Sequence, residues 1–131
     1  MESLRSSLRL LASIGCAAVL IGASLPQAMV GPGEWEITKS ASATHGDRIC
    51  LRDPALLMQW EHRSKKCTRA IVTSSLDRAE LNYTCAGGGF GTSRVEMLTP
   101  RSVKINTQGI SDGLPFAYVL HARRVGDCAA R

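Results

Sequence analysis

The chain has 131 residues, of which 44% are hydrophobic and 21% are charged, and its formal net charge at pH 7 is +5. Without the leader described next, 103 residues remain, which is enough for one domain and too few for two separate cores. Apart from one clump, the basic residues are dispersed with no basic stripe interleaved with aromatic residues, so we exclude nucleic acid as a partner.

The N-terminus has the pattern of a secretory signal peptide. Arg5 and Arg9 precede an apolar run at residues 10–23, and the breaker-rich segment 24–28 follows it. A membrane-spanning helix needs about 20 apolar residues, and this run is about 14 residues long. We therefore expect the leader to be cleaved and the mature protein to lie outside the cytoplasm.

The cleavage site is less sharply defined than the leader. We expect a mature N-terminus between Leu25 and Met29, so that residues 1–28 form the signal peptide and residues 29–131 form one domain. Lipidation at Cys16 is disfavoured, because the residues before it lack the usual leucine and the apolar run continues past it.

Four cysteines remain after cleavage, and their even number in a short exported chain predicts two disulfides. They are Cys50, Cys67, Cys85 and Cys128. Their spacing contains no C-x-x-C or C-x-H pair that would place two ligands on one zinc knuckle. We expect structural cysteines and no metal site.

Most of the domain alternates apolar and polar residues with a period of two, which is typical of half-buried strands. In the first such segment, Trp35 and Ile37 share one face, and Glu34 and Glu36 share the other. Further strands are predicted at Cys67–Thr73, Ala79–Cys85, Ser93–Leu98, Val103–Thr107 and Phe116–Arg123. This pattern predicts an all-β domain, mostly an antiparallel meander, forming a small sandwich or a partly closed barrel.

One short helix is expected after Asp53-Pro54. The Asp53 carboxylate is suited to cap a helix, and the ring of Pro54 fixes a helical φ at the first position. Leu56, Leu57 and Trp60 then fall on one helical face, which we expect to point to the core.

Motifs for catalysis are absent from the sequence. The run Gly87–Gly91 is not followed by Lys-Ser or Lys-Thr, so we interpret it as a connection between strands and not as a phosphate-binding loop. The chain has no G-x-S-x-G motif. The three histidines lack the spacing of a metal site, and they are His45, His62 and His121. We expect no enzymatic activity and no cofactor, and a hydrolase whose Ser, His and Asp converge in space is the least favoured alternative.

Hairpin geometry suggests how two of the cysteines pair. If Cys67–Thr73 and Ala79–Cys85 form an antiparallel pair about Leu76, then Cys67 lies directly opposite Cys85. Opposed Cβ atoms lie about 4.5–5.5 Å apart, which is close to the span of a disulfide. We therefore predict a disulfide across this hairpin.

The second disulfide would join Cys50 to Cys128 and close a loop of nearly 80 residues. In the chain-entropy model it stabilises by roughly 4 kcal/mol, against about 3 kcal/mol for the shorter bridge. We therefore expect the loss of Cys128 to cost more than the loss of Cys85. A register slip of one residue would oppose Cys67 to Thr84 and leave the pairing open.

A clump of basic residues is the one candidate binding feature in the sequence. It contains Arg63, Lys65, Lys66 and Arg69. A solvated basic edge is its simplest interpretation, and salt-sensitive binding to anionic lipid or polysaccharide is the alternative.

Four features occur in order along the mature chain: Pro32–Thr38, Cys50-Leu51, the two middle cysteines Cys67 and Cys85, and the closing Arg124–Cys128. In these features the chain resembles one family, the exported proteobacterial proteins known as domain of unknown function 3617. The resemblance spans essentially the whole mature chain. It implies a periplasmic all-β domain with four ordered cysteines, and it implies no activity.

These features favour a non-catalytic, monomeric periplasmic domain that binds an envelope protein, lipid or glycan. The alternative is an inhibitor of an envelope-active hydrolase of lysozyme or protease type, because a rigid, stapled scaffold suits inhibition by pre-organised loops. The candidate inhibitory loops are Ser40–Asp47 and Gln108–Pro115.

Overall fold

The structure is a computed structural model, and it describes residues 24–129. Most of the predicted signal peptide, residues 1–23, lies outside the described residues. In the described part of the chain, no helix is long and apolar enough to cross a membrane.

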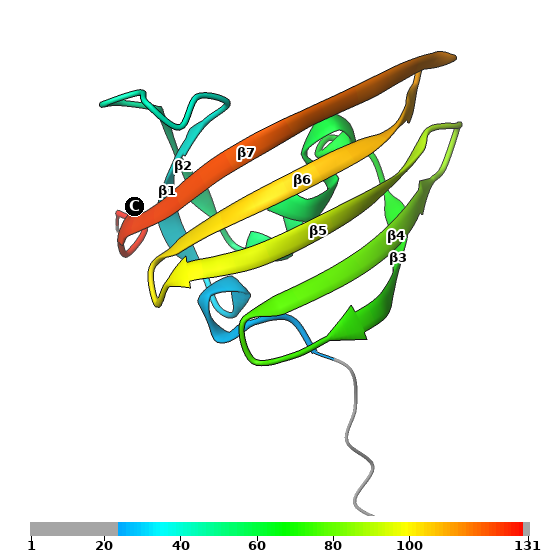
Figure 1. The fold of residues 1–131 in the computed structure, drawn as a ribbon. Coiled ribbons are helices and arrows are strands. Elements are labelled where there is room, and N and C mark those ends of the chain that lie inside the picture. The colour runs from blue at the N-terminus through cyan, green and yellow to red at the C-terminus, as the bar shows by residue number, and fades with distance from the viewer. Residues whose placement is uncertain (1–23, 130–131) are drawn as a thin grey trace, which may run out of the picture.

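The domain is built on one antiparallel sheet of seven strands (Figure 1). The strands are β1 (Gly33–Thr38), β2 (Asp47–Leu51), β3 (Cys67–Ser74), β4 (Arg78–Cys85), β5 (Phe90–Thr99), β6 (Ser102–Ser111) and β7 (Leu114–Gly126). Their order across the sheet is β2-β1-β7-β6-β5-β4-β3. The all-β meander predicted from the sequence is confirmed. The sheet curves without closing, and its inner face is covered by helical segments rather than by a second sheet.

The main helical segment, η2 (Pro54–His62), crosses the inner face of β4, β5 and β6. The Asp53 carboxylate accepts a hydrogen bond of 3.0 Å from the backbone N–H of Ala55, so the predicted cap is present. The segment is a 3-10 helix with a kink at Gln59, whose φ of −126° is not helical. A single short helix at this position agrees with the expectation from the sequence, while its 3-10 form was not foreseen.

The kink at Gln59 changes which side chains of η2 face the core. Residues three apart lie above one another in a 3-10 helix, so an unbroken segment would place Trp60 above Leu57. Leu57 and Met58 are fully buried, whereas Leu56 and Trp60 are only half-buried. Of the predicted face, Leu57 points to the core as expected, whereas Leu56 and Trp60 are only partly buried and Trp60 packs at the margin of the core. The buried indole of the domain belongs to Trp35, which is 0% exposed.

Inward-facing residues of five strands form the core. They include Trp35, Leu81, Val95, Ile105 and Leu120, each at most 2% exposed. The predicted alternation holds in β1, where the odd-numbered residues 33–37 are buried and the even-numbered residues 34–38 are half-buried. It holds in β7 for Leu120 and Ala122, while Phe116 and Tyr118 are half-buried because they lie nearer the end of the sheet.

The short segment η1 (Gln27–Met29) also packs into the core. Ala28 and Met29 are 8% and 2% exposed, and Pro26 is fully buried. A domain that begins at residue 29 would lack Pro26 and Ala28. The packed part of the chain therefore begins about four residues before the boundary expected from the sequence.

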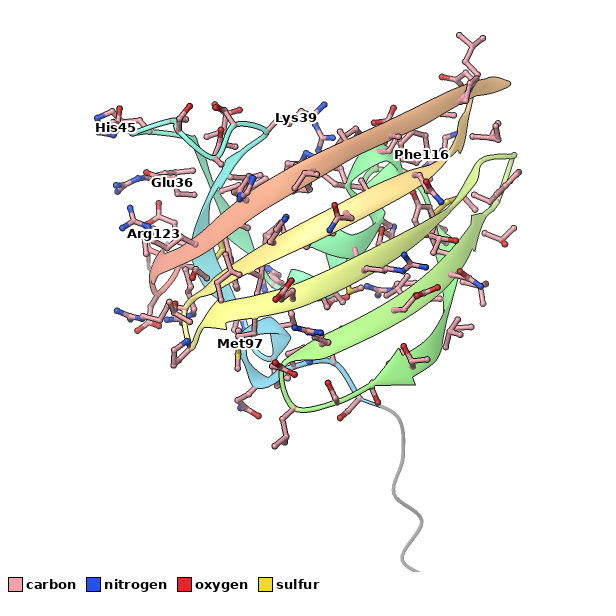
Figure 2. All side chains as sticks on the ribbon, viewed as in Figure 1. Glu36, Lys39, His45, Met97, Phe116 and Arg123 are labelled. Atoms are coloured by element: carbon pink, nitrogen blue, oxygen red, sulfur yellow. A yellow bond between two sulfur atoms is a disulfide. The ribbon has the colours of Figure 1, made fainter. Side chains whose placement is uncertain are left out.

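On the outer face, the strand register places opposite charges side by side. Glu36 lies between Arg48 on β2 and Arg123 on β7, with N–O distances of 3.2 and 3.1 Å (Figure 2). The hydrogen bond from Arg48 is the main cause that lowers the pKa of the Glu36 carboxyl below its ordinary value, and Arg123 adds to it. Arg94 and Glu80 form a similar cross-strand pair at 2.6 Å. The outer face is thus a solvated, ion-paired surface.

Both predicted disulfides are present. Cys67 pairs with Cys85, which lies directly opposite it in the register of β3 and β4. The register is the predicted one from Cys67 as far as Ile71 and then shifts by one residue at a bulge. The second disulfide joins Cys50 to Cys128 across a sequence separation of 78 residues.

The long bridge should contribute strongly to stability. We expect the double variant Cys50→Ser/Cys128→Ser to lose about 4 kcal/mol of unfolding free energy, because the bridge restricts a long loop of the unfolded chain. Neither cysteine is buried, so the loss reports the crosslink rather than core packing. Urea unfolding of the variant and of the oxidised wild type measures the difference. A loss below about 1 kcal/mol would contradict the entropic account.

The earlier expectation that Cys128 matters more than Cys85 needs a correction for burial. Cys85 is 6% exposed and belongs to the core, so its replacement removes packing as well as a crosslink. Only the variant that lacks Cys50 and Cys128, neither of which is buried, therefore reports the loop entropy of a bridge without a change in core packing.

Candidate functional site

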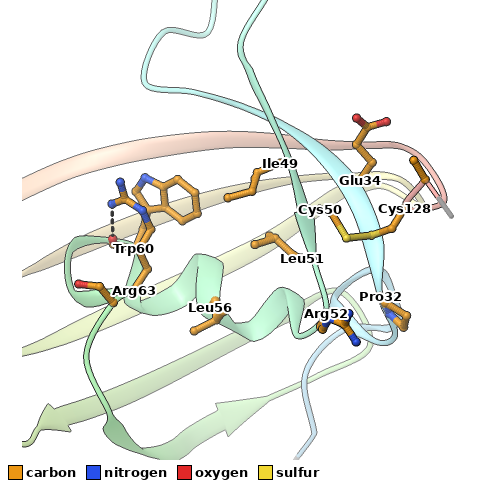
Figure 3. Close-up of a pocket in the computed structure, with 12 residues that line it drawn as sticks. Pro32, Glu34, Ile49, Cys50, Leu51, Arg52, Leu56, Trp60, Arg63 and Cys128 are labelled. Carbon is orange, nitrogen blue, oxygen red and sulfur yellow. Dashed lines mark hydrogen bonds between the residues drawn. A yellow bond between two sulfur atoms is a disulfide. The ribbon is translucent and has the colours of Figure 1, made fainter. Parts of the chain in front are cut away.

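A groove of about 1000 Å³ lies between β2 and η2, at one margin of the sheet (Figure 3). Its apolar lining comes from two elements that are adjacent in sequence. Ile49 and Leu51 belong to β2, and Leu56 and Trp60 belong to η2. Ile49 is 39% exposed, and Leu51 is buried at the base. The groove therefore presents apolar side chains to solvent beside a sheet edge.

The groove follows from where β2 lies in the sheet. Among the described residues, β2 is the outermost strand and pairs only with β1, so one edge of its backbone has no strand partner there. Ile49 lies opposite Trp35 in the register and faces the same side of the sheet. Trp35 is covered by the core, whereas Ile49 lies beyond the reach of η2 and remains exposed.

Two arginines line the apolar part of the groove. The guanidinium of Arg63 lies 4.4 Å from the centre of the Trp60 ring, and its Nη1 donates a 3.0 Å hydrogen bond to the Trp60 carbonyl oxygen. Arg52 follows β2 directly and lines the opposite end (Figure 3). Within residues 24–129, no carboxylate lies within ion-pair distance of Arg52 or Arg63. Both guanidinium groups are available to an acidic ligand.

The Cys50–Cys128 disulfide forms part of the groove wall. It fastens the outermost strand to the segment that follows β7. Glu34 of β1 lies on the same side as this disulfide (Figure 3). β2 is held along one edge by hydrogen bonds to β1, and near its C-terminal end it is held by the Cys50–Cys128 disulfide.

The predicted basic clump is divided by the fold. Arg69 forms a 2.8 Å ion pair with Asp53 at the start of η2, whereas Arg63 lies at the other end of η2 and lines the groove. The Nζ of Lys65, which precedes Lys66 in the chain, donates a 3.3 Å hydrogen bond to the carbonyl oxygen of Gly88. The four residues do not form one binding surface. Sequence reasoning missed Ile49 and Arg52, whose only signal was their position in a short strand before the helix.

A buried polar cluster fixes the C-terminal end of η2 to the sheet. His62 is 1% exposed, and its Nδ1 lies 3.1 Å from the hydroxyl of Tyr83. Gly89 packs against this ring, and any side chain at position 89 would collide with it. The sequence analysis indicated only that His62 lies at the end of a helix. Among residues 24–129, no three potential metal ligands from His, Cys, Asp and Glu come together.

A second polar contact joins the middle of η2 to the sheet. The hydroxyl of Ser93 donates a 2.5 Å hydrogen bond to the carbonyl oxygen of Met58 and lies 2.8 Å from the Thr107 hydroxyl. Burial raises the pKa of Tyr83 to about 12, although a hydrogen bond with Thr107 opposes the shift. These contacts satisfy polar groups inside the core and position η2.

Tyr118 extends the cluster towards solvent. Its hydroxyl donates a 3.0 Å hydrogen bond to Glu61, and the Nζ of Lys39 lies 4.0 Å from the centre of its ring. Burial, and next the bond to Glu61, raise the pKa of Tyr118 above its ordinary value. Both tyrosines are thus held in the neutral form.

The two loops expected for an inhibitor lie apart. The loop between β1 and β2 begins where Thr38 pairs with His121, whereas the β6–β7 turn precedes Leu114. Seven residues of β7 separate these points, which is about 23 Å at the usual rise of a strand. The loops therefore do not form one contiguous inhibitory edge. The glycine run connects β4 to β5, as interpreted from the sequence.

The chain was compared with known families, curated proteins and solved structures. Residues 30–128, about three quarters of the chain, match the family described as protein of unknown function DUF3617. The chain belongs to this family. The resemblance noted from the sequence is therefore confirmed. No curated protein matches the chain. No solved structure matches it either.

Both tyrosines of this DUF3617 domain should resist ionisation while the domain is folded. We expect the tyrosinate absorbance of the native protein to be absent at pH 10, where unfolded tyrosines are about half ionised. Because the tyrosine pKa values are higher in the folded than in the unfolded state, the neutral tyrosines contribute fully to the stability of the fold below about pH 10. This contribution is lost as the pH rises through the pKa values of the folded state. Spectrophotometric titration with and without guanidinium chloride measures both. One ionised tyrosine per native molecule at pH 10 would contradict the buried cluster.

Proposed function

We propose that the protein is a non-catalytic binding domain of the periplasm whose groove between β2 and η2 receives an extended segment of another envelope protein. The observation that carries this proposal is the unpaired edge of β2, which borders a groove with exposed apolar side chains. An unpaired edge offers backbone N–H and C=O groups to an added strand. Lipid and glycan ligands would make no use of this edge.

The groove provides the side-chain contacts that strand addition needs. Alternate side chains of an added strand point to the two faces of the sheet. On the inner face they would meet Ile49, Leu56 and Trp60, and on the other they would meet the Cys50–Cys128 disulfide. Arg52 and Arg63 would favour acidic residues at the two ends of the segment, because guanidinium groups bind carboxylates with matched geometry.

The edge is pre-organised for binding. The disulfide and the hydrogen bonds to β1 hold β2 in its extended form. A strand that is already ordered loses little conformational entropy when a partner adds to it. This economy fits a small monomeric domain that binds through a single strand.

Two features support export to the periplasm. All four cysteines beyond residue 28 are paired in disulfides, which persist in oxidising compartments. The N-terminal sequence has the basic region and the short apolar run of a signal peptide.

The packing of η1 sharpens the expected cleavage site. We expect a mature N-terminus at Leu25, because cleavage after Ser24 places Gly22 and Ser24 at the recognised small positions and keeps Pro26, Ala28 and Met29 in the core. Mass spectrometry of the periplasmic fraction identifies the terminus. An N-terminus at Met29, or an intact Met1, would contradict this expectation.

The groove can be tested with a peptide probe. The probe is a ten-residue peptide of alternating Val and Thr with Asp at both ends, and half-buried Trp60 is the fluorescent reporter. We expect saturable binding with a change in Trp60 emission, while Trp35 gives a constant background because it is fully buried. A peptide with Pro at alternate positions should not bind, because proline cannot donate to the ladder.

Variants locate the site of binding. Arg63→Gln should weaken peptide binding about ten-fold, because a charge-assisted hydrogen bond is lost, and Ile49→Ser should weaken it as well. Arg101→Gln, at the exposed β5–β6 turn, is the matched control and should bind as the wild type does. Equal binding of the proline peptide would overturn strand addition, and unchanged binding by both groove variants would overturn the site.

A further inference from the structure

Five strand ends meet at one end of the sheet, which we call the loop end. It comprises the start of β3, the β4–β5 loop and the β6–β7 turn, at residues 65–67, 85–90 and 110–115. Figure 1 shows the β4–β5 and β6–β7 connections projecting together at this end. The groove of the proposed function is lined chiefly by β2 and η2, so the loop end is a separate surface.

Apolar side chains gather at the loop end. The register places Phe90 opposite Ile110 on β6, and Ile110 opposite Pro115 on β7. Phe90 is 53% exposed, and Leu114 at the turn is 69% exposed. A hollow of about 710 Å³ is lined by Phe90, Ile110, Pro115 and Phe116, and Leu114 lies one residue beyond it at the turn. We call Phe90, Ile110, Leu114 and Pro115 the apolar tip, and its two most apolar exposed members, Phe90 and Leu114, are left uncovered by the described part of the chain.

A tight turn between β6 and β7 places Leu114 of the apolar tip at the end of a hairpin. Asp112 and Gly113 have φ angles of 50° and 77°, as in the tight two-residue turn that suits a twisted hairpin. Leu114 follows this turn directly and begins the longest strand, β7. The apolar side chain is therefore held at the extremity of a rigid hairpin.

Basic side chains lie beside the apolar tip. The hydrogen bond from Lys65 to Gly88 ties the η2–β3 connection to the β4–β5 loop. The backbone bond from the N–H of Ala86 to the carbonyl oxygen of Lys66 does the same. Both lysines of the predicted clump therefore belong to the loop end, with Arg63 nearby. Asp112 at the turn carries the opposing charge.

We propose that the loop end docks on an anionic lipid bilayer, with Phe90 and Leu114 in the acyl boundary and Lys65 and Lys66 at the headgroups. An apolar wedge flanked by cations is complementary to such an interface, because apolar groups leave water while cations meet lipid phosphates. Long lysine side chains reach headgroups while apolar neighbours insert more deeply. Docking of a second copy at the same end would bring the lysines of the two molecules together.

The test measures sedimentation with vesicles of phosphatidylethanolamine and phosphatidylglycerol, using the chain from Leu25 onward, which contains all described elements. We expect binding to these vesicles and weak binding to vesicles of phosphatidylcholine. Phe90→Ser/Leu114→Ser should weaken binding by more than about ten-fold, because the inserted apolar area is lost. Lys65→Gln/Lys66→Gln should weaken it about five-fold per lysine and flatten its salt dependence.

The opposite end of the sheet provides a matched control. Leu76 and Leu98 are 92% and 55% exposed there, and Leu76→Ser/Leu98→Ser should bind vesicles as the wild type does. Circular dichroism verifies that all three double variants fold. Vesicle binding that is unaffected by Phe90→Ser/Leu114→Ser, equal loss in the control, or no binding by the wild type would overturn the proposal. A Leu114-dependent dimer without vesicle binding would assign the tip to a second copy instead.

Discussion

The inner face of the sheet is wider than η2, the main helical segment that covers it, is long. Much of the structure follows from this mismatch. Seven strands about 4.8 Å apart span roughly 29 Å, whereas nine residues of 3-10 helix reach about 18 Å. η2 therefore covers the central strands, and η1 adds Ala28 and Met29 to the core. The margin at β2 is left as a groove with apolar walls. The groove is thus a consequence of covering an open sheet with a short helix.

An open sheet also has two edge strands, and the disulfides are placed at these two edges. Cys67–Cys85 fastens β3 to its neighbour β4, and Cys50–Cys128 fastens β2 to the segment after β7. Edge strands are the parts of a sheet most prone to fray or to pair with other chains. Covalent fastening keeps them ordered, and an ordered edge is suited to selective pairing. Stability and the proposed binding function therefore depend on the same bonds.

The position of η2 is set by polar contacts within the core. Ser93 holds the Met58 carbonyl in the middle of the helix, and Tyr83 holds His62 at its end. Because buried polar groups are costly without partners, these contacts favour one placement of the helix over others. That placement puts Arg63 in the groove and directs the following lysines to the loop end. The two proposed surfaces are thus arranged by one helix.

The sequence by itself determined the alternation of β1, the capped helix after Asp53 and the register that opposes Cys67 to Cys85, because each depends on neighbours in the chain or on one hairpin. Only the tertiary structure decided that β1 lies beside β7 and that β2 is an edge, because contacts between distant strands leave no local pattern. The 3-10 form of η2 and the burial of His62 depend on the sheet beneath them. The loop end combines residues that are dispersed in sequence, and the groove adds Cys128 to a lining from adjacent elements, since the sheet brings together parts of the chain that no local spacing reveals.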